Sequence, residues 1–211
     1  LRTKGWELML TWNDAFKLAN KPFRYNLSVG LADNTSEITK FDNPSKILSD
    51  YYVGQKLGDI WGYVVDGLFR TDEEAANYNV DQTAVNFVIN TAQVNPGLHA
   101  GDMKFVDLDG DHTISSGSNT ADDPGDRKII GNSLPRYTYS IQGGFDWYGF
   151  DFSIYLQGVG HQDWYPGTNS VFFWGPYARP YSSFIPRDFL SQVWSPENPD
   201  AYFPRPIGYL A

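Results

Sequence analysis

The chain of 211 residues has no cysteine, only two methionines and no long hydrophobic run. Without cysteine it has no disulfide, no thiolate metal site and no cysteine nucleophile. No apolar stretch approaches the roughly 20 residues that a transmembrane helix needs. The opening segment, LRTKGWELML, lacks the pattern of a signal peptide and predicts a strand instead.

Positive charge is also scarce, because 16 Lys and Arg face 25 Asp and Glu, for a net charge of −9. A nucleic-acid surface would be basic, so we expect no nucleic-acid partner. The three histidines, His99, His112 and His161, lie in separate segments, without the HExxH spacing of a zinc protease or a Ser/His/Asp order. We therefore expect no enzymatic activity.

Aromatic residues are abundant, at 17% of the chain. They suit either the interfacial girdles of a membrane protein or surfaces that stack on sugars. Four segments alternate apolar and polar side chains, which predicts strands with one apolar face. Their apolar positions are Trp6, Leu8, Leu10 and Trp12; Phe23, Tyr25, Leu27, Val29 and Leu31; Tyr137, Tyr139, Ile141, Phe145 and Trp147; and Phe150, Phe152, Ile154 and Leu156.

The predicted fold class is mainly β, with antiparallel strands. A soluble sheet with one buried face fits this alternation, and so does a transmembrane barrel. Aromatic residues at the strand ends favour the barrel. We expect a tight hairpin at Tyr148-Gly149, a modest connection over 14–22, and long excursions after the second and fourth strands. Short turns on one side and long loops on the other are typical of an outer-membrane barrel.

Within the long segments, two short helices are predicted. Thr71-Asp72-Glu73-Glu74 is a capping box before Ala75 and Ala76. The second helix covers 186–194, with Pro186 in its first turn and Ser195-Pro196 after its end.

An acidic loop, GDMKFVDLDGDHTI, resembles the start of an EF-hand loop. Asp107, Asp109 and Asp111 occupy positions 1, 3 and 5, and Thr113 offers its backbone carbonyl at position 7. The predicted ligand is a hard cation such as Ca²⁺. Two positions depart from the pattern: His112 replaces the usual glycine at position 6, and Ser118 replaces the acid at position 12. An acid further along could fold back instead, and the candidates are Asp122, Asp123 and Asp126. The alternative is a plain turn whose Asp side chains bond their own backbone.

Four blocks in order resemble the SusC/RagA family of TonB-dependent outer-membrane transporters. The first is GDIWGYVVDGLF (58–69), similar to GYxxDGIF, and the second runs from GDMKFVDLDGD (101–111) to DRKIIGN (126–132), similar to GDIKYKDLNGDGxIDxxDRxIIGN. The third covers PRYTY (135–139) to GFDFSIYLQG (149–158), and the fourth is WSPENP (194–199), similar to WTPENP. Members are several times longer, and four strands do not close a membrane barrel, so we expect the chain to be an internal or C-terminal-half part of such a protein.

The resemblance implies import of nutrients, oligosaccharides or peptides, across the outer membrane. It implies a SusD-like lipoprotein over the barrel and the TonB complex, which would act through parts of the protein outside this chain. It aligns Asp126 with the last acid of the loop, and the loop then becomes a structural pin in an extracellular excursion. The implied division is a barrel strand pair (1–31), a long extracellular region (32–136), a barrel hairpin (137–157) and an aromatic-rich extracellular region (158–211).

The second excursion is dense in aromatic residues, which could form its own small core, contact the SusD-like partner or stack on substrate. The candidates for partner or substrate contact are Trp164, Tyr165, Phe173, Trp174 and Tyr177. A different reading of the whole chain is a soluble extracellular module that binds glycans with Ca²⁺ and packs its four strands into a sandwich.

Overall fold

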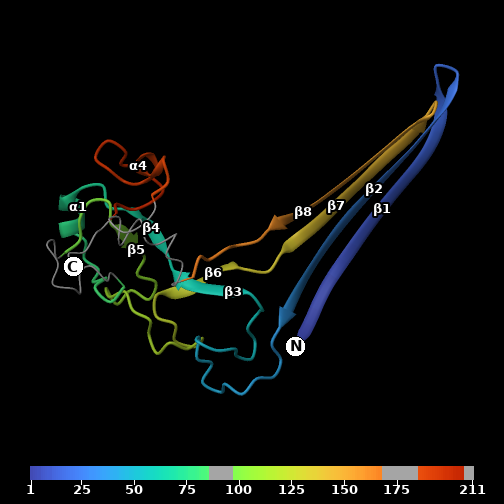
Figure 1. Cartoon of the computed structure of the whole chain (residues 1–211). Coiled ribbons are helices and arrows are strands. Elements are labelled where there is room, and N and C mark those ends of the chain that lie inside the picture. Colours follow the sequence, from blue (N-terminus) through green and yellow to red (C-terminus); the bar gives the residue numbers. More distant parts are fainter. Residues whose placement is uncertain (86–96, 168–184, 207–211) are drawn as a thin grey trace. The chain divides into compact units, whose positions relative to one another are not determined.

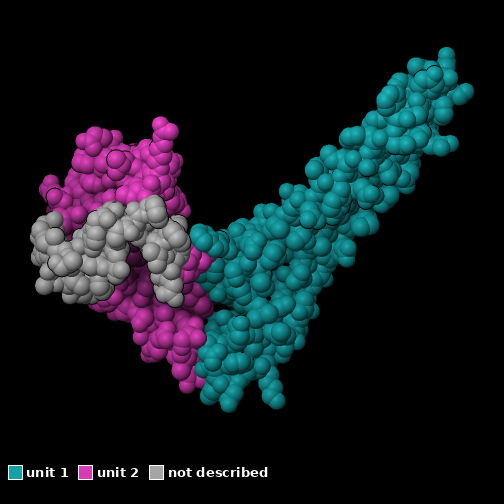
Figure 2. Space-filling model, in the orientation of Figure 1, with its two compact units in different colours: residues 1–44, 50–60, 131–164 teal, residues 45–49, 61–130, 165–211 magenta. Residues whose placement is uncertain are grey.

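The structure is a computed structural model, and it describes residues 1–85, 97–167 and 185–206. The chain is mainly antiparallel β with little helix, as predicted. It divides into two compact units (Figure 2). Unit 1 holds residues 1–44, 50–60 and 131–164, and unit 2 holds 45–49, 61–130 and 165–211. No helix in the described part of the chain is long and apolar enough to cross a membrane.

Unit 1 is dominated by a four-stranded antiparallel sheet, whose strands run side by side in the order β1-β2-β7-β8 (Figure 1). The strands are β1 (Arg2–Leu18), β2 (Lys21–Glu37), β7 (Arg136–Trp147) and β8 (Phe150–His161). All four predicted strands are confirmed, and each extends beyond its alternating core.

The prediction of a modest connection over 14–22 is wrong, because a tight turn joins the two strands instead. β1 and β2 pair without interruption up to Leu18 and Lys21. Ala19 and Asn20 both take left-handed backbone, at φ 49° and 61°, which is the requirement of a two-residue hairpin turn. The sequence hides this turn because it contains no glycine. Pro22 is tolerated because it stands at the start of its strand. The second hairpin turn, Tyr148-Gly149, is confirmed.

The register places both tight turns at one end of the sheet, because Phe23 opposes Trp147. It also aligns the apolar positions of all four strands on one face. Two such rows of directly opposed residues are Phe16, Phe23, Trp147 and Phe150, and Leu10, Val29, Ile141 and Leu156. We call this side the apolar face and the other side the polar face.

Unit 2 contains short elements around a small core. They are β4 (Val65–Leu68), which pairs with β5 (Met103–Phe105), and the helices α1 (Asp72–Ala76) and α4 (Phe189–Gln192). The core residues Phe69 and Ile114 are fully buried, and Phe105, Phe189 and Val193 are nearly so. A further two-stranded sheet, not confined to the residues of unit 2, joins β3 (Asp59–Tyr63) to β6 (Arg127–Asn132). None of the short strands β3 to β6 was predicted.

Both predicted helices are present, and both are short. Thr71 caps α1, since its hydroxyl accepts the Glu74 N–H at 3.1 Å. Glu74 completes the cap by accepting the N–H of Arg70 at 2.8 Å, one residue earlier than in the usual box. The second helix was predicted over 186–194 but covers only Phe189–Gln192, because Pro186 contributes a turn before it.

A buried ion pair ties two distant segments of unit 2 together. The carboxylate of Asp102 is almost completely buried and accepts two hydrogen bonds from the Arg205 guanidinium, at 2.6 and 3.1 Å. Asp102 also accepts the backbone N–H of His99. Because the pair is bidentate and its acid is fully hydrogen-bonded, it holds 99–102 and the segment around 205 in one arrangement.

Candidate functional site

The four-stranded sheet is the first candidate site, because it has no core of its own. Among the residues that the structure describes, no hydrophobic side chain of β1, β2, β7 or β8 is buried. Its apolar face instead exposes large side chains such as Trp12, Phe150 and Leu10, each more than 60% exposed. Contiguous apolar surface on this scale marks contact with another protein or with a membrane.

An aromatic belt crosses all four strands at the end with the tight turns. Phe16 lies 5.0 Å from Phe23, measured between ring centroids. Phe23 stacks on Phe145 at 5.4 Å, and Phe145 stacks on Phe152 at 5.4 Å. Such pairs stabilise a sheet by about 0.5–1.5 kcal/mol each beyond their burial. Aliphatic residues follow the belt toward the centre, and Trp6 stands on the apolar face beyond them.

The spacing of the aromatic rows matches the thickness of a membrane. Along β2, Asp33, which faces Trp6, lies ten positions beyond Phe23. At about 3.4 Å per residue this is about 34 Å of strand. Strands of outer-membrane barrels tilt by about 35–45°, so the vertical distance becomes about 24–28 Å. The apolar band of such barrels is about 25 Å tall.

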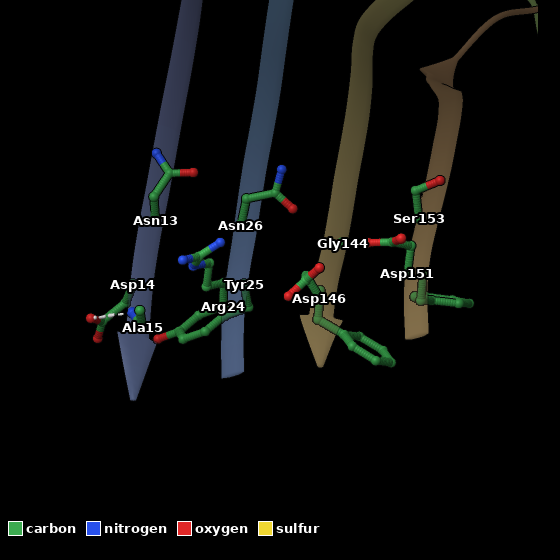
Figure 3. A pocket seen from close by; sticks show the side chains of 12 residues that line it. Asn13, Asp14, Ala15, Arg24, Tyr25, Asn26, Gly144, Asp146, Asp151 and Ser153 are labelled. Carbon is green, nitrogen blue, oxygen red and sulfur yellow. Dashed lines mark hydrogen bonds between the residues drawn. The ribbon is translucent and has the colours of Figure 1, made fainter. Parts of the chain in front are cut away.

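The polar face carries mainly neutral hydrogen-bonding groups. Thr11 and Ser28 bond each other across β1 and β2 at 3.0 Å. A shallow groove crosses this face near the tight turns, lined by Asn13, Asn26 and Ser153 among others (Figure 3). Charges gather beside the turns, where the register sets Arg24 opposite Asp146 and Asp146 opposite Asp151. Polar groups on one face and apolar groups on the other are the pattern of a barrel wall between lumen and lipid.

The acidic loop of unit 2 is the second candidate site. Asp107, Asp109 and Asp126 each offer a carboxylate oxygen, and these three oxygens lie within 4.8 Å of one another. Asp126 is completely buried, and its two oxygens accept the N–H groups of Leu108 and Ser115, both at 2.7 Å. In the described part of the chain, no Lys or Arg forms an ion pair with it. A buried carboxylate normally has a paired charge or a metal ion.

The loop also satisfies its own backbone, as the alternative interpretation expected. Asp107 accepts the N–H groups of Gly110 and His112, at 2.7 and 2.9 Å. Asp109 accepts the N–H of Asp111 at 3.1 Å. His112 takes left-handed backbone at φ 64°, the conformation for which the EF-hand pattern uses glycine. The geometry therefore contains both a turn and a convergence of carboxylates.

The pKa values of the two outer carboxyl groups shift in opposite directions. Burial raises the pKa of Asp107, but the hydrogen bonds from His112 and Gly110 outweigh it, so the net direction is downward. The Asp111 N–H lowers the pKa of Asp109, but burial and repulsion from Asp111, Asp126 and Asp107 outweigh it, so its pKa is raised. Mutual repulsion of this kind is what a bound cation relieves.

The other residues considered for the loop lie elsewhere. Asp111 is outside the group of three, and its carboxylate accepts the Thr113 N–H at 2.7 Å. Thr113 forms an isolated parallel bridge with Asp81. Asp122 pairs with Lys46 at 2.7 Å, and Asp123 accepts the hydroxyl and the N–H of Ser118. Of the three acids that could fold back, the structure brings Asp126 to the loop.

The aromatic candidates for partner contact are only partly described. Trp164 is 73% exposed and Tyr165 is 53% exposed. Phe173, Trp174 and Tyr177 lie outside the described residues. Sequence reasoning missed a different pair, Asp33 and Arg136, whose two hydrogen bonds of 2.6 Å join β2 to β7 at the end of the sheet away from the tight turns. A separation of 103 positions along the chain hides this pair, because only the register brings the two residues together.

Comparison with known proteins points to one class. No family model matches the chain. It is 27% identical over 177 residues to TonB-dependent receptor P39 of Formosa agariphila, and the match covers 73% of this chain and 16% of that protein. It is 22% identical over 170 residues to TonB-dependent receptor P3 of the same organism, with 74% and 15% covered. The chain thus spans about a sixth of the length of these relatives. Over about three quarters of its length, the chain is thus similar to two proteins named TonB-dependent receptors.

Proposed function

We propose that this chain forms part of the barrel wall and the extracellular loops of a TonB-dependent transporter that imports nutrients across the outer membrane. The observation that carries the proposal is the four-stranded sheet with one predominantly apolar face and no core of its own. In water this face would be a large aggregation-prone surface. Against lipid it is the surface that a barrel strand needs.

The edges of the sheet support the same proposal. Within the described residues β1 pairs only with β2, and β8 pairs only with β7. Open edges do not occur in the hydrocarbon region, because unpaired N–H and C=O groups there cost several kcal/mol each. We therefore propose that neighbouring strands of a longer protein complete the wall on both sides.

In this proposal the tight turns lie at the periplasmic side and the long segments are extracellular, as outer-membrane barrels arrange short turns and long loops. The resemblance of the chain to SusC/RagA proteins motivates the finer parts of the proposal. These are an oligosaccharide or peptide as the nutrient, a SusD-like lipoprotein over the extracellular side, and the TonB complex as the source of energy. Trp164 and Tyr165 are the described candidates for contact with that lipoprotein or the nutrient.

The localisation is tested by fractionation of a Gram-negative host that expresses the full-length protein. We expect the protein in the outer-membrane fraction, retained after an alkaline wash and released by detergent. A monodisperse protein in the detergent-free soluble fraction would contradict the proposal and would favour the soluble glycan-binding module. Loss of nutrient uptake in a strain without TonB tests the transport step separately.

We further propose that Asp107, Asp109 and Asp126 hold a cation such as Ca²⁺, which pins the loop in unit 2. Asp126 supports this, because it is a buried carboxylate beside two others. The upward pKa shift of Asp109 supports it as well, since the neighbouring carboxylates repel the negative charge of Asp109. Carboxylate oxygens are the ligands that Ca²⁺ prefers.

Hydrogen exchange of the full-length protein with and without Ca²⁺ tests this loop. Extracellular sites of this kind bind with a Kd of about 10⁻⁴–10⁻³ M. At 10 mM Ca²⁺ the local opening free energy should then rise by about 1.4–2.7 kcal/mol. Asp109→Ala should abolish the effect, whereas Asp122→Ala, which removes an exposed acid paired with Lys46, should retain it. Equal exchange with and without Ca²⁺ in the unmodified protein would leave only the plain turn.

A further inference from the structure

Lys21 occupies a distinctive place on the apolar face, one row beyond the aromatic belt. The register sets it opposite Leu18, on the same face as Phe23. Its ammonium nitrogen lies 4.8 Å from the centroid of the Tyr148 ring in the neighbouring turn. The indole N–H of Trp147 donates to the backbone carbonyl of Leu18 at 3.3 Å, which ties the two hairpins together at this point.

The charge of Lys21 has no acidic counterpart on its own face nearby. In the part of the chain that the structure describes, no carboxylate lies within 4.0 Å of its ammonium group. Asp14 is the next acid on the apolar face by register, but it lies two rows further into the sheet on β1, about 14 Å along the strands. Asp146 and Asp151, beside the same turns, belong to the polar face.

At the opposite end of the sheet the two arginines are paired, and Lys4 on the apolar face lowers the pKa of Glu37 through its charge but has no ring contact within the described residues. Arg2 bonds Glu37 at 2.6 Å, and Arg136 forms two bonds with Asp33. The rim beside the tight turns thus presents an unpaired ammonium group next to Trp147 and Tyr148. Aromatic rings with polar tips and long cationic side chains take this position at the headgroup level of a bilayer.

We propose that Lys21 binds the phosphate of an anionic phospholipid at the rim beside the tight turns, with Trp147 and Tyr148 flanking the headgroup. The proposal rests on the proposed membrane location of the sheet and adds a lipid site to it. Charge complementarity selects this occupant, because a basic side chain at a membrane surface favours anionic over zwitterionic lipid. The ring of Tyr148 positions the ammonium group and leaves its N–H donors for phosphate oxygens.

Lys17 provides a matched control. It stands near the same turn, opposite Pro22, but on the polar face. Lys17→Gln and Lys21→Gln remove the same charge from nearly the same height on opposite sides of the sheet. A purely electrostatic effect of net charge would therefore be equal in the two variants, whereas a lipid site on the apolar face depends on Lys21 alone.

The test uses the full-length protein in a nonionic detergent, with lipid binding measured by native mass spectrometry. Phosphatidylglycerol is the anionic probe, and phosphatidylcholine is the zwitterionic one. We expect the unmodified protein to prefer phosphatidylglycerol. In Lys21→Gln the ratio of the affinities for the two lipids should fall by about five-fold. Lys21→Arg should retain it, Lys17→Gln should leave it unchanged, and added salt should weaken it.

Two results from the variants would overturn the proposal. One is an unchanged preference in Lys21→Gln, and the other is an equal loss in Lys17→Gln. Failure of the proposed function looks different, because the full-length protein would then remain soluble and monodisperse without detergent. A protein that requires detergent and binds both lipids equally would remove the lipid site while leaving the barrel wall in place.

Discussion

Leu10 and Met9 are neighbours in β1 that should respond in opposite ways to an introduced charge. Both are about equally exposed in the chain itself, at 62% and 66%. Leu10 belongs to the apolar face, in a row with Val29 near the middle of the band between Phe23 and Asp33. Met9 projects to the polar face. Their exposure is thus matched, and only the side of the sheet differs.

Leu10→Arg should destabilise the full-length protein in lipid vesicles by about 2–4 kcal/mol, the cost of arginine at the midplane of a barrel's lipid face. Met9→Arg should change stability by less than about 0.5 kcal/mol, since a polar face accommodates charge as a surface does. Leu18 lies on the apolar face outside the aromatic belt, so Leu18→Arg should lower the free energy of unfolding by only about 0–1 kcal/mol. The depth dependence separates a membrane from a packed protein core.

The assay is reversible unfolding by guanidinium chloride in the presence of vesicles, followed by tryptophan fluorescence. The difference in midpoint between each variant and the parent, multiplied by the slope m, gives the change in the free energy of unfolding. Equal effects of Leu10→Arg and Met9→Arg would refute the assignment of the two faces. A large effect of Leu18→Arg would instead place the boundary of the apolar band elsewhere.

Two further predictions concern unit 2, and local hydrogen exchange checks both. Asp102→Ala should destabilise unit 2 by about 3–5 kcal/mol, because it leaves the Arg205 guanidinium without its buried partner. As a control, Asp200→Ala removes an exposed ion pair and should cost less than about 1 kcal/mol. Equal costs would contradict the role of burial. Glu74 accepts the N–H of Arg70 and a hydrogen bond from Lys104, and these bonds lower its pKa. Its stabilisation of α1 is therefore fully present above the unfolded pKa of about 4.3 and is lost as the pH falls through the folded pKa. Glu74→Gln should flatten this acid dependence of exchange in α1, and an unchanged profile would assign it to other acids.

The sheet was predictable because its signal is local. Alternation along β1 from Trp6 to Trp12 needs no information about other strands, and the apolar face follows from it. The turn at Ala19-Asn20 was not predictable by the same means, since neither residue is the glycine that usually supplies positive φ. β1 and β2 therefore continue through residues whose sequence predicts a loop.

The acidic loop shows the opposite situation. Asp107 and Asp109 were identified from their spacing, but the third acid depends on a fold-back over 17 residues from Asp109 to Asp126. Sequence left three acids open there, and packing decides among them, because only Asp126 is buried beneath the loop. The short strands β4 and β5 escaped prediction for a similar reason. Three or four residues carry too little periodicity, and their pairing joins Val65 to Phe105 across the chain.

The central claim, that one face of the sheet contacts lipid, is tested most directly by spin labels placed singly along β1. Labels at 7 to 12 in the full-length protein, reconstituted into vesicles, report collision with oxygen, which concentrates in lipid, and with a water-soluble nickel complex. We expect accessibility to oxygen at 8, 10 and 12 and accessibility to nickel at 7, 9 and 11, with a period of two residues. Uniform accessibility to nickel along the whole strand would contradict the account.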